Sequence, residues 1–334
     1  MDSLSQIVLG AACGQAAAGK QLGNKALFWG AIGGTIPDLD TFLTPFFDNV
    51  TALLVHRGYT HSMFFSFVVA PILASILYKF NKTVKWRTWF FLFFFSLLTH
   101  PLLDIFTGYG TPLFLPFSDF RVDINSIFII DPVYTLIYIF CLIAVMRAGK
   151  DHVKRTKWNN RGIILSTSYL LFTLLNQSIH NKIFKEELDK QKIEYTQSFA
   201  APTAFNQILF YNVTIAKDGY YLGYHSWFDS KPPMFTFYPK NDSLLPAVFH
   251  TEPRILKLKY FSKNMYCFEK QPDGLYFCDV RFGKMSGFYE EAPWVFRWKL
   301  IFNEKKNTLK IEKGNWSFSR FKALGKLWVR IKGN

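Results

Sequence analysis

The first half of the sequence has few carboxylates. Residues 1–182 contain nine Asp and no Glu at all, whereas the whole chain of 334 residues has 24 acidic residues. Cysteine is also scarce. The four cysteines lack the paired spacing of a zinc ribbon and do not require a disulfide framework. No basic segment precedes the first apolar stretch, so we expect the first helix to be retained rather than removed as a signal peptide.

Basic residues exceed acidic ones and give a formal net charge of +15. On a soluble protein this charge would indicate nucleic-acid binding. However, half of the residues are hydrophobic, 37 of them Phe, and long apolar stretches fill the sequence before about residue 183. Basic residues in the short loops of a membrane protein explain the charge better, because they lie beside anionic lipid. We therefore expect a lipid bilayer as the partner and no nucleic acid.

The apolar stretches predict membrane-spanning helices, since a bilayer core requires about 20 apolar residues per helix. Two early stretches are shorter and rich in Gly and Ala, a composition that favours close helix packing. The sequence thus predicts an α-helical multi-pass membrane bundle of about six spans over residues 1–182, followed by a β-rich domain over residues 183–334. The predicted spans are 4–18, 26–36, 62–80, 86–106, 127–146 and 162–179.

The loops between these stretches predict the orientation of the bundle. Lys20 and Lys25 join the first two spans, several basic residues lie in 79–87, and six lie in 147–161. Basic loops stay on the cytoplasmic side. Residues 38–61, 107–126 and the β-rich domain are therefore expected on the outer side of a bacterial cytoplasmic membrane.

Turn-forming residues separate strand-like segments in the second half. We predict strands at 205–215, 220–227, 255–261 and 295–302, whereas residues 319–332 fit either a membrane-surface helix or a final strand. Cys267 and Cys278 flank a turn at 271–274 that would place them opposite each other. They are either bridged by a disulfide or two buried thiols.

Four short motifs bring Asp and His to the predicted outer ends of the spans. They are Pro-Asp-Leu-Asp at 37–40, His-Arg-Gly-Tyr-Thr-His-Ser at 56–62, Thr-His-Pro-Leu-Leu-Asp at 99–104 and Ile-Asp-Pro at 130–132. Ionisable groups inside or at the end of a hydrophobic segment are costly, by up to about 2.5–3.5 kcal/mol each at the centre of a span, so they usually face a cavity or a partner. His100 and Asp104, four positions apart, share one helix face and suit a metal ion.

This composition predicts a metal site with one or two ions. Mixed imidazole and carboxylate ligands favour zinc, with manganese as the alternative. Arg57 is a candidate phosphate clamp, and Asp40 and Asp131 are candidate catalytic carboxylates. Asp131 precedes a proline and is equally suited to begin a helix. The candidate metal ligands are Asp38, Asp40, His56, His61, His100 and Asp104.

In their order and spacing, the first three motifs resemble the YdjM-type family of membrane-bound, metal-dependent hydrolases over about residues 1–150. That family is similar, more distantly, to zinc-dependent phospholipase C, whose helices contribute His and Asp to a zinc cluster. The resemblance implies a ligand role for the six residues above. This chain departs from the family near its start, where Ser5-Gln6 replaces a common Thr-His pair.

We therefore expect a membrane-bound hydrolase that acts on a phosphate or similar ester of a lipid-like substrate at the outer face of the membrane. The alternative is a non-catalytic protein that binds or transports a metal ion. A transporter requires polar groups throughout the bundle, and the spans at 62–80 and 127–146 have almost none at mid-depth.

Overall fold

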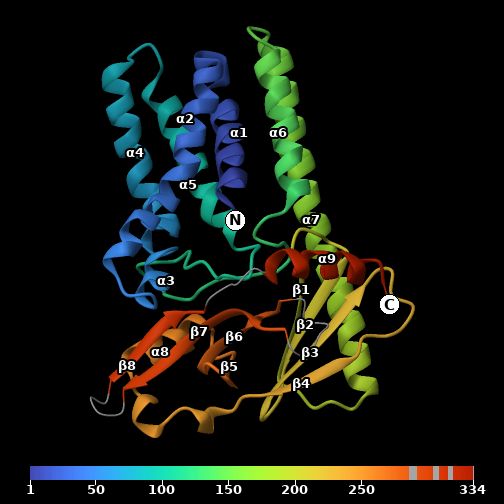
Figure 1. Cartoon of the computed structure of the whole chain (residues 1–334). Helices are drawn as coiled ribbons and strands as arrows, with labels where there is room; N and C mark the ends of the chain where they lie inside the picture. Colours follow the sequence, from blue (N-terminus) through green and yellow to red (C-terminus); the bar gives the residue numbers. More distant parts are fainter. Residues whose placement is uncertain (286–291, 304–307, 315–318, 334) are drawn as a thin grey trace. The chain divides into compact units, whose positions relative to one another are not determined.

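The computed structural model describes residues 1–285, 292–303, 308–314 and 319–333 (Figure 1). The chain forms two compact units. Unit 1 comprises residues 1–44, 55–175 and 204–206, and unit 2 comprises residues 45–54, 176–203 and 207–334. The division falls inside helix α7 (His152–Lys190), which contributes its first part to unit 1 and its second part to unit 2.

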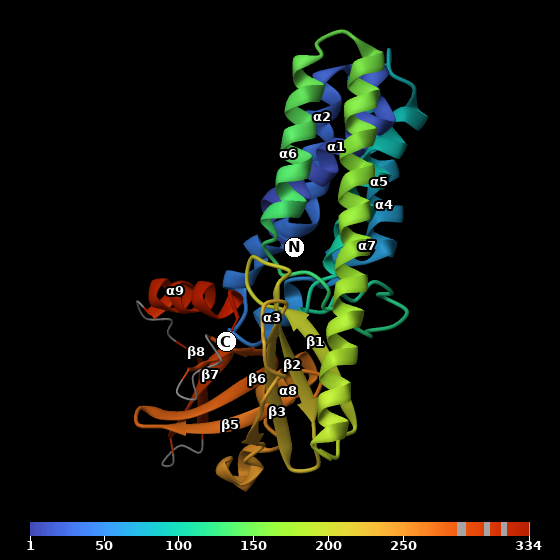
Figure 2. The ribbon, with the colours of Figure 1, turned by 90° about the vertical axis from the view of Figure 1, so that its right-hand side faces the viewer.

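Unit 1 is a bundle of helices that lie side by side (Figures 1 and 2). Two 3-10 helices connect the helices near one end, and the five-residue helix α3 (Thr51–Val55) belongs to unit 2 except for its last residue. Besides the first part of α7, the bundle contains α1 (Ser3–Leu22), α2 (Asn24–Thr35), η1 (Ile36–Phe46), η2 (Tyr59–His61), α4 (Met63–Phe80), α5 (Trp86–Asp104) and α6 (Pro132–Arg147).

Glycines let α1 and α2 pack with their backbones in close contact. A Cβ on Gly10 would lie 2.8 Å from the Gly34 Cα, and one on Gly14 would lie 2.8 Å from the Gly30 Cα. Both distances are too short for any side chain. Small residues at a helix crossing are typical of membrane bundles, where packing rather than water exclusion holds the helices together.

Among the residues that the structure describes, two helices are long and apolar enough to cross a membrane: α4 and α7. Helix α6 is also apolar but shorter. It begins at Pro132, so the prediction of a helix from residue 127 was wrong at its start. Asp131 accepts a hydrogen bond from the Tyr134 N–H and caps α6, and Pro132 suits a first helical turn.

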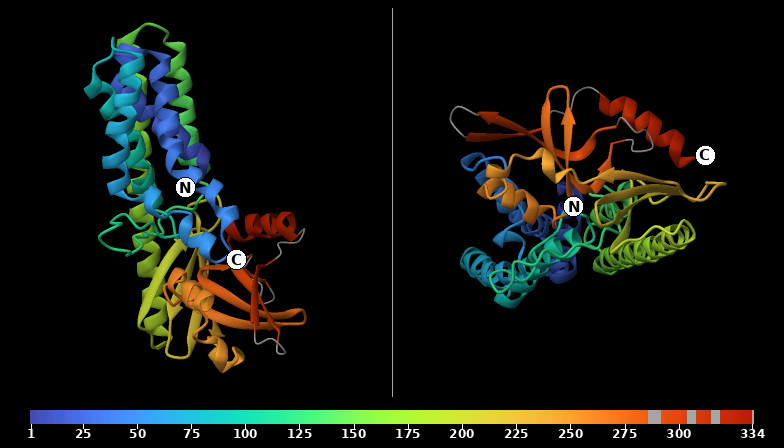
Figure 3. Two further views of the ribbon diagram at one scale, coloured as in Figure 1. Left: turned by 90° about the vertical axis from the view of Figure 1, so that its left-hand side faces the viewer. Right: turned by 90° about the horizontal axis from the view of Figure 1, so that it is seen from below.

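Unit 2 contains two four-stranded antiparallel sheets (Figure 3). The first has the order β1 (Gln197–Pro202), β2 (Leu209–Ile215), β3 (Gly219–Ser226) and β4 (Phe235–Pro239). The second has the order β5 (Tyr266–Gln271), β6 (Gly274–Lys284), β7 (Trp294–Asn303) and β8 (Thr308–Lys313). Unit 2 also contains η3 (Asp242–Leu244), η4 (Ala247–Phe249), α8 (Pro253–Phe261) and α9 (Ser319–Ile331).

The strand predicted at 255–261 was wrong, because these residues form α8. Lys257 and Lys259 alternate with apolar residues, which is typical of a strand. However, Ile255, Leu258 and Phe261 are all buried, and their spacing of three places them on one face of a helix. Residues 319–332 fitted either a helix or a strand, and residues 319–331 of this segment form α9.

The hairpin of β5 and β6 places Cys267 directly opposite Cys278. Gln271 pairs with Gly274, so the turn is formed by Pro272 and Asp273. Both cysteines are buried, and both are free thiols in this structure. The predicted facing of the two cysteines is confirmed, and the bridge between them stays a prediction.

Candidate metal centre

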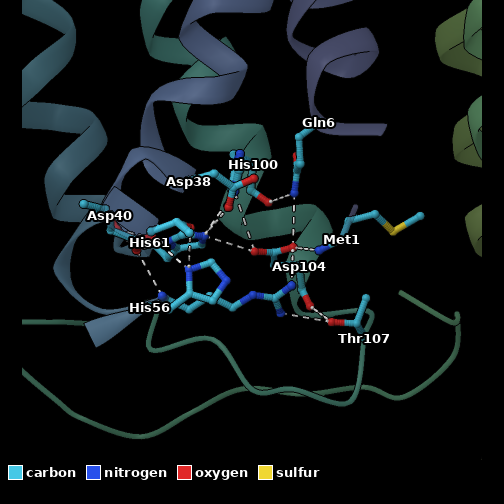
Figure 4. A network of polar contacts seen from close by, with 12 residues as sticks. Met1, Gln6, Asp38, Asp40, His56, His61, His100, Asp104 and Thr107 are labelled. Carbon is cyan, nitrogen blue, oxygen red and sulfur yellow. Dashed lines mark hydrogen bonds and ion pairs between the residues drawn. The ribbon is translucent and has the colours of Figure 1, made fainter. Parts of the chain in front are cut away.

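Three elements of unit 1 bring acidic and imidazole side chains to one point (Figure 4). Asp38 lies in η1, His61 ends η2, and His100 and Asp104 lie near the end of α5. His61, His100 and Asp104 are fully buried. Asp38, His61 and His100 each offer one ligand atom, and these atoms lie within 4.8 Å of one another.

The nitrogen and oxygen atoms of this cluster are close enough to share one ion. The Nε2 atoms of His61 and His100 are 3.1 Å apart, and Asp38 Oδ1 is 3.4 Å from each. Asp104 Oδ2 is 3.4 Å from His61 Nε2 and 3.7 Å from His100 Nε2. Four tetrahedral ligands about 2.0–2.1 Å from a zinc ion would lie roughly 3.3–3.4 Å from one another. The three distances among Asp38, His61 and His100 are close to that spacing. Asp104 Oδ2 lies near both imidazoles but falls outside the group of atoms that are all within 4.8 Å of one another.

The other ring nitrogens fix how the two histidines point. His100 Nδ1 lies 2.6 Å from the Gly34 carbonyl oxygen and therefore donates its hydrogen there. That carbonyl belongs to the last turn of α2, where carbonyls lack partners within the helix. His61 Nδ1 lies 3.0 Å from Thr60 Oγ1, whose hydroxyl donates to Asp40. With both Nδ1 atoms donating, two Nε2 lone pairs face each other, and a proton or a cation must lie between them.

Unpartnered buried atoms support a cation. Asp104 Oδ2 and Gln6 Oε1 are both buried and have no hydrogen-bond partner. Gln6 Nε2 donates to Asp104 Oδ1 over 3.1 Å and to the His100 carbonyl oxygen over 3.2 Å. A buried oxygen that accepts no hydrogen bond lowers the stability of a protein. The same oxygen has a partner when a bound metal ion coordinates it. The donor set therefore fits a divalent metal ion.

Asp40 and His56 lie beside the cluster and hydrogen-bond to each other. His56 Nδ1 is 2.8 Å from Asp40 Oδ1, and Asp40 Oδ2 accepts from the Arg57 N–H and the Thr60 hydroxyl. Asp40 thus orients the turn that carries His61. The ring centroids of His56 and His61 are 5.9 Å apart, and the His56 side chain is 31% exposed.

Arg57 is buried behind Asp104. Its Nη2 lies 3.3 Å from Asp104 Oδ1, its Nη1 donates to the Thr107 hydroxyl over 3.2 Å, and its guanidinium lies over the Tyr109 ring. The Met1 amino group is also paired with Asp104 Oδ1. Asp104 therefore presents one oxygen to positive groups and the other to the imidazoles.

The surroundings shift the pKa values of the groups between the predicted spans. Burial raises the pKa of Asp38, but hydrogen bonds from His100 and His61 outweigh it and keep this pKa well below its usual range. Burial likewise raises the pKa of Asp40, and hydrogen bonds from His56, His61 and Thr60 bring it below its usual range. Burial lowers the pKa of His61, but hydrogen bonds to Asp38 and Asp40 raise it overall. Both carboxylates are ionised, as metal ligands must be.

Asp131 is not part of the group that the structure brings together. Its Oδ1 accepts from the Tyr134 N–H over 3.0 Å and its Oδ2 from the Tyr169 hydroxyl over 2.9 Å. Sequence reasoning missed the Gly34 carbonyl and the hydroxyls of Thr60 and Thr107. The position of Gly34 in the last turn of a short helix is a usable signal for a free carbonyl.

The fold and the site define a helical membrane protein with a buried cluster of His and Asp suited to a metal ion. The chain belongs to the YdjM inner membrane protein family, whose profile matches residues 1–183, more than half of the 334 residues. The family resemblance of the sequence motifs is thereby confirmed.

Two relatives extend the comparison. The chain is 26% identical over 209 residues to the uncharacterized protein YfhP of Bacillus subtilis (strain 168), covering 60% of this chain and 63% of that one. It is 37% identical over 99 residues to the inner membrane protein YbcI of Escherichia coli (strain K12), covering 29% of this chain and 57% of that one. The matched regions thus span somewhat less than two thirds of each relative. No solved structure matches this chain.

Proposed function

We propose that this protein is a membrane-bound, metal-dependent hydrolase that acts on a phosphate or similar ester of a lipid-like substrate. The observation that carries the proposal is the facing pair of imidazole nitrogens, 3.1 Å apart, with Asp38 and Asp104 beside them. In this proposal Asp38, His61, His100 and Asp104 hold the ion. Zinc suits this mixed set best, and manganese is the alternative.

When bound, zinc polarises an ester oxygen and makes water a better nucleophile at neutral pH. The carboxylates of Asp104, which is buried, and Asp38, which is partly buried, would balance the charge of one divalent ion between two neutral imidazoles. Arg57 adds one positive charge nearby and Asp40 one negative charge, so the ion itself would supply the attraction for an anionic group such as a phosphate ester. Arg57 acts by holding Asp104, with which it is already paired, rather than as a free clamp.

Proton transfer is assigned to His56. Its Nδ1 is bound to Asp40, which leaves Nε2 to accept a proton from water or to donate one to the leaving group. Its exposure is greater than that of the other two histidines of the cluster. Asp40 is a positioning residue here, because both of its oxygens are taken by His56, Arg57 and Thr60.

The proposal places the site at the outer face of the cytoplasmic membrane, with about six spans and unit 2 outside the cytoplasm. The basic loops at 79–87 and 147–161 support this orientation, because such loops stay inside. All residues of the cluster come from the opposite ends of the spans.

The test is the metal content and activity of the detergent-purified protein. Elemental analysis should find zinc or manganese in the wild type and much less in His100→Ala. His152→Ala is the matched control, because His152 is exposed at the start of α7 and should leave the metal content unchanged. Release of phosphate or headgroup from phospholipid vesicles should follow the metal content.

Equal metal in wild type and His100→Ala would contradict the metal centre. Bound metal without hydrolysis of any phospholipid or isoprenoid phosphate would instead support the second candidate, a non-catalytic metal-binding protein.

A further inference from the structure

A loop of unit 1, residues 113–120, exposes three aromatic side chains, with the exposed Ser118 and Asp119 between the last two of them. Phe114 is 46% exposed, Phe117 is 82% exposed and Phe120 is 63% exposed. Exposed apolar patches of this kind mark an interaction site. The loop follows α5, which carries His100 and Asp104, and so continues directly from the metal centre.

Main-chain hydrogen bonds hold the loop in this shape. The Leu113 carbonyl accepts from the Met63 N–H over 2.9 Å, and the Phe114 carbonyl accepts from the N–H groups of Phe117 and Ser118 over 2.8 and 3.1 Å. An antiparallel bridge between Thr111 and Val122 closes its base. The aromatic rings are therefore presented outward by a defined turn.

The loop is continuous with the surface that α4 offers to lipid. The Phe117 ring meets the Phe64 ring edge to face, with centroids 6.0 Å apart. Phe64 lies in the first turn of α4, a candidate membrane span whose apolar side chains are mostly exposed. Further exposed residues on α4 are Phe67, Val68, Ile72 and Ile76. Phe117 thus lies beside the end of this candidate span, where the boundary between headgroups and acyl chains is expected.

The 3-10 helix η1 has the same character on its outward side. Phe42 is 75% exposed, and Leu39 and Leu43 are also exposed. Asp38 and Asp40 of the same helix point to the metal centre. Both η1, which carries Asp38, and the loop at 113–120, which follows α5 in the chain, therefore expose apolar side chains.

We infer that residues 113–120 form a loop that inserts into the phospholipid bilayer beside α4, without crossing it. The occupant of the exposed aromatic surface is lipid, because the surface continues that of a membrane span. For the proposed hydrolase, and resting on that proposed function, this insertion would place the metal centre beside lipid headgroups, so that the substrate enters from the bilayer.

Site-specific photocrosslinking tests the insertion without reference to activity. The full chain with p-benzoylphenylalanine in place of Phe117 is reconstituted into vesicles of phosphatidylethanolamine and phosphatidylglycerol, irradiated and analysed by mass spectrometry. Phospholipid adducts should form in a yield similar to that of the same substitution at Phe67 on α4. The matched control is Phe237 on β4, which is also partly exposed but lies in unit 2.

A lipid-adduct yield at Phe117 that is several-fold above the yield at Phe237 supports the inference. A yield no higher than at Phe237, or adducts to protein instead of lipid, overturns it. Neither result depends on hydrolysis, so failure of the inserted loop is distinguishable from failure of the proposed activity.

Discussion

At the scale of single residues, two histidines of one motif have different surroundings. His61 is buried with its Nε2 facing His100, whereas the half-exposed His56 contacts Asp40. We predict that His61→Ala removes most of the bound metal, because a direct ligand is lost. His56→Ala should keep most of the metal and lose hydrolysis. Elemental analysis and a vesicle assay of both variants check this, and equal metal loss in both would make His56 a ligand as well.

Metal binding should also depend on pH. Burial lowers the pKa of His61, but its hydrogen bonds to Asp38 and Asp40 raise this pKa overall, so the ring keeps its proton to a higher pH than an ordinary imidazole when no ion is bound. An ion must displace that proton, and the apparent zinc affinity should therefore fall as the pH decreases, by up to about tenfold per pH unit. Competition with a chromophoric chelator at several pH values measures the slope. A flat profile, with helical circular dichroism unchanged, would show that no proton leaves.

The buried pair of Arg57 and Asp104 should matter for stability. Their side chains are 6% and 1% exposed, and removal of one partner leaves a buried charge uncompensated. We predict that Arg57→Met lowers the free energy of unfolding by up to about 3–5 kcal/mol. Arg57→Lys should recover part of this loss, because it restores the charge but not the planar fork. Thermal unfolding in detergent measures both variants.

The control for this pair is Lys154→Met, which removes a cation from an exposed pair with Asp151. That variant should melt like the wild type, since exposed pairs contribute little. An unchanged melting temperature in Arg57→Met would mean that Gln6 and the Met1 amino group suffice to hold Asp104.

At the scale of elements, the packing of α1 against α2 positions groups that contact the metal-binding side chains. Gln6 of α1 and the Gly34 carbonyl of α2 both contact the cluster. We predict that Gly14→Ala destabilises the bundle by about 1–3 kcal/mol or more, because its Cβ would meet backbone atoms that do not move aside. Gly325→Ala in α9 is the matched control, with no atom within 4 Å of the added Cβ. A melting temperature lowered equally in both variants would contradict the close crossing.

The parts of the structure that a distinct sequence motif or turn marks could be predicted from the sequence. The motifs at 37–40, 56–62 and 99–104 do meet, because each lies at the end of a helix, where the chain reverses. The register of the β5–β6 hairpin followed from its turn residues. By contrast, α8 was missed. Lys257 and Lys259 alternate with apolar residues as in a strand, and the helix is too short for its helical periodicity to be recognised in the sequence. Main-chain ligands such as the Gly34 carbonyl were missed because no side chain marks them.

At the scale of the whole molecule, the apolar helices agree with the family. The chain belongs to a family of inner membrane proteins, and the basic residues of its first half lie in the segments between apolar helices. Helices α4 and α7 are sufficiently apolar to span a membrane by themselves. The glycine-rich α1 and α2 are less apolar, which is consistent with burial among other helices, where small residues matter more than hydropathy.

The orientation of the chain decides which compartment the metal centre faces. Alkaline phosphatase, which folds only outside the cytoplasm, should be active when fused after Asn334 and inactive when fused near Lys154, and a green fluorescent protein should give the opposite pattern. The physical reason is the set of basic residues at 79–87 and 147–161, which resist transfer across the membrane. A matched pair of fusions within 107–126 and 79–87 checks the two ends of α5, whose C-terminal end carries His100 and Asp104. Phosphatase activity near Lys154 and none after Asn334 would place the cluster in the cytoplasm, and a lipid substrate would then have to come from the inner leaflet.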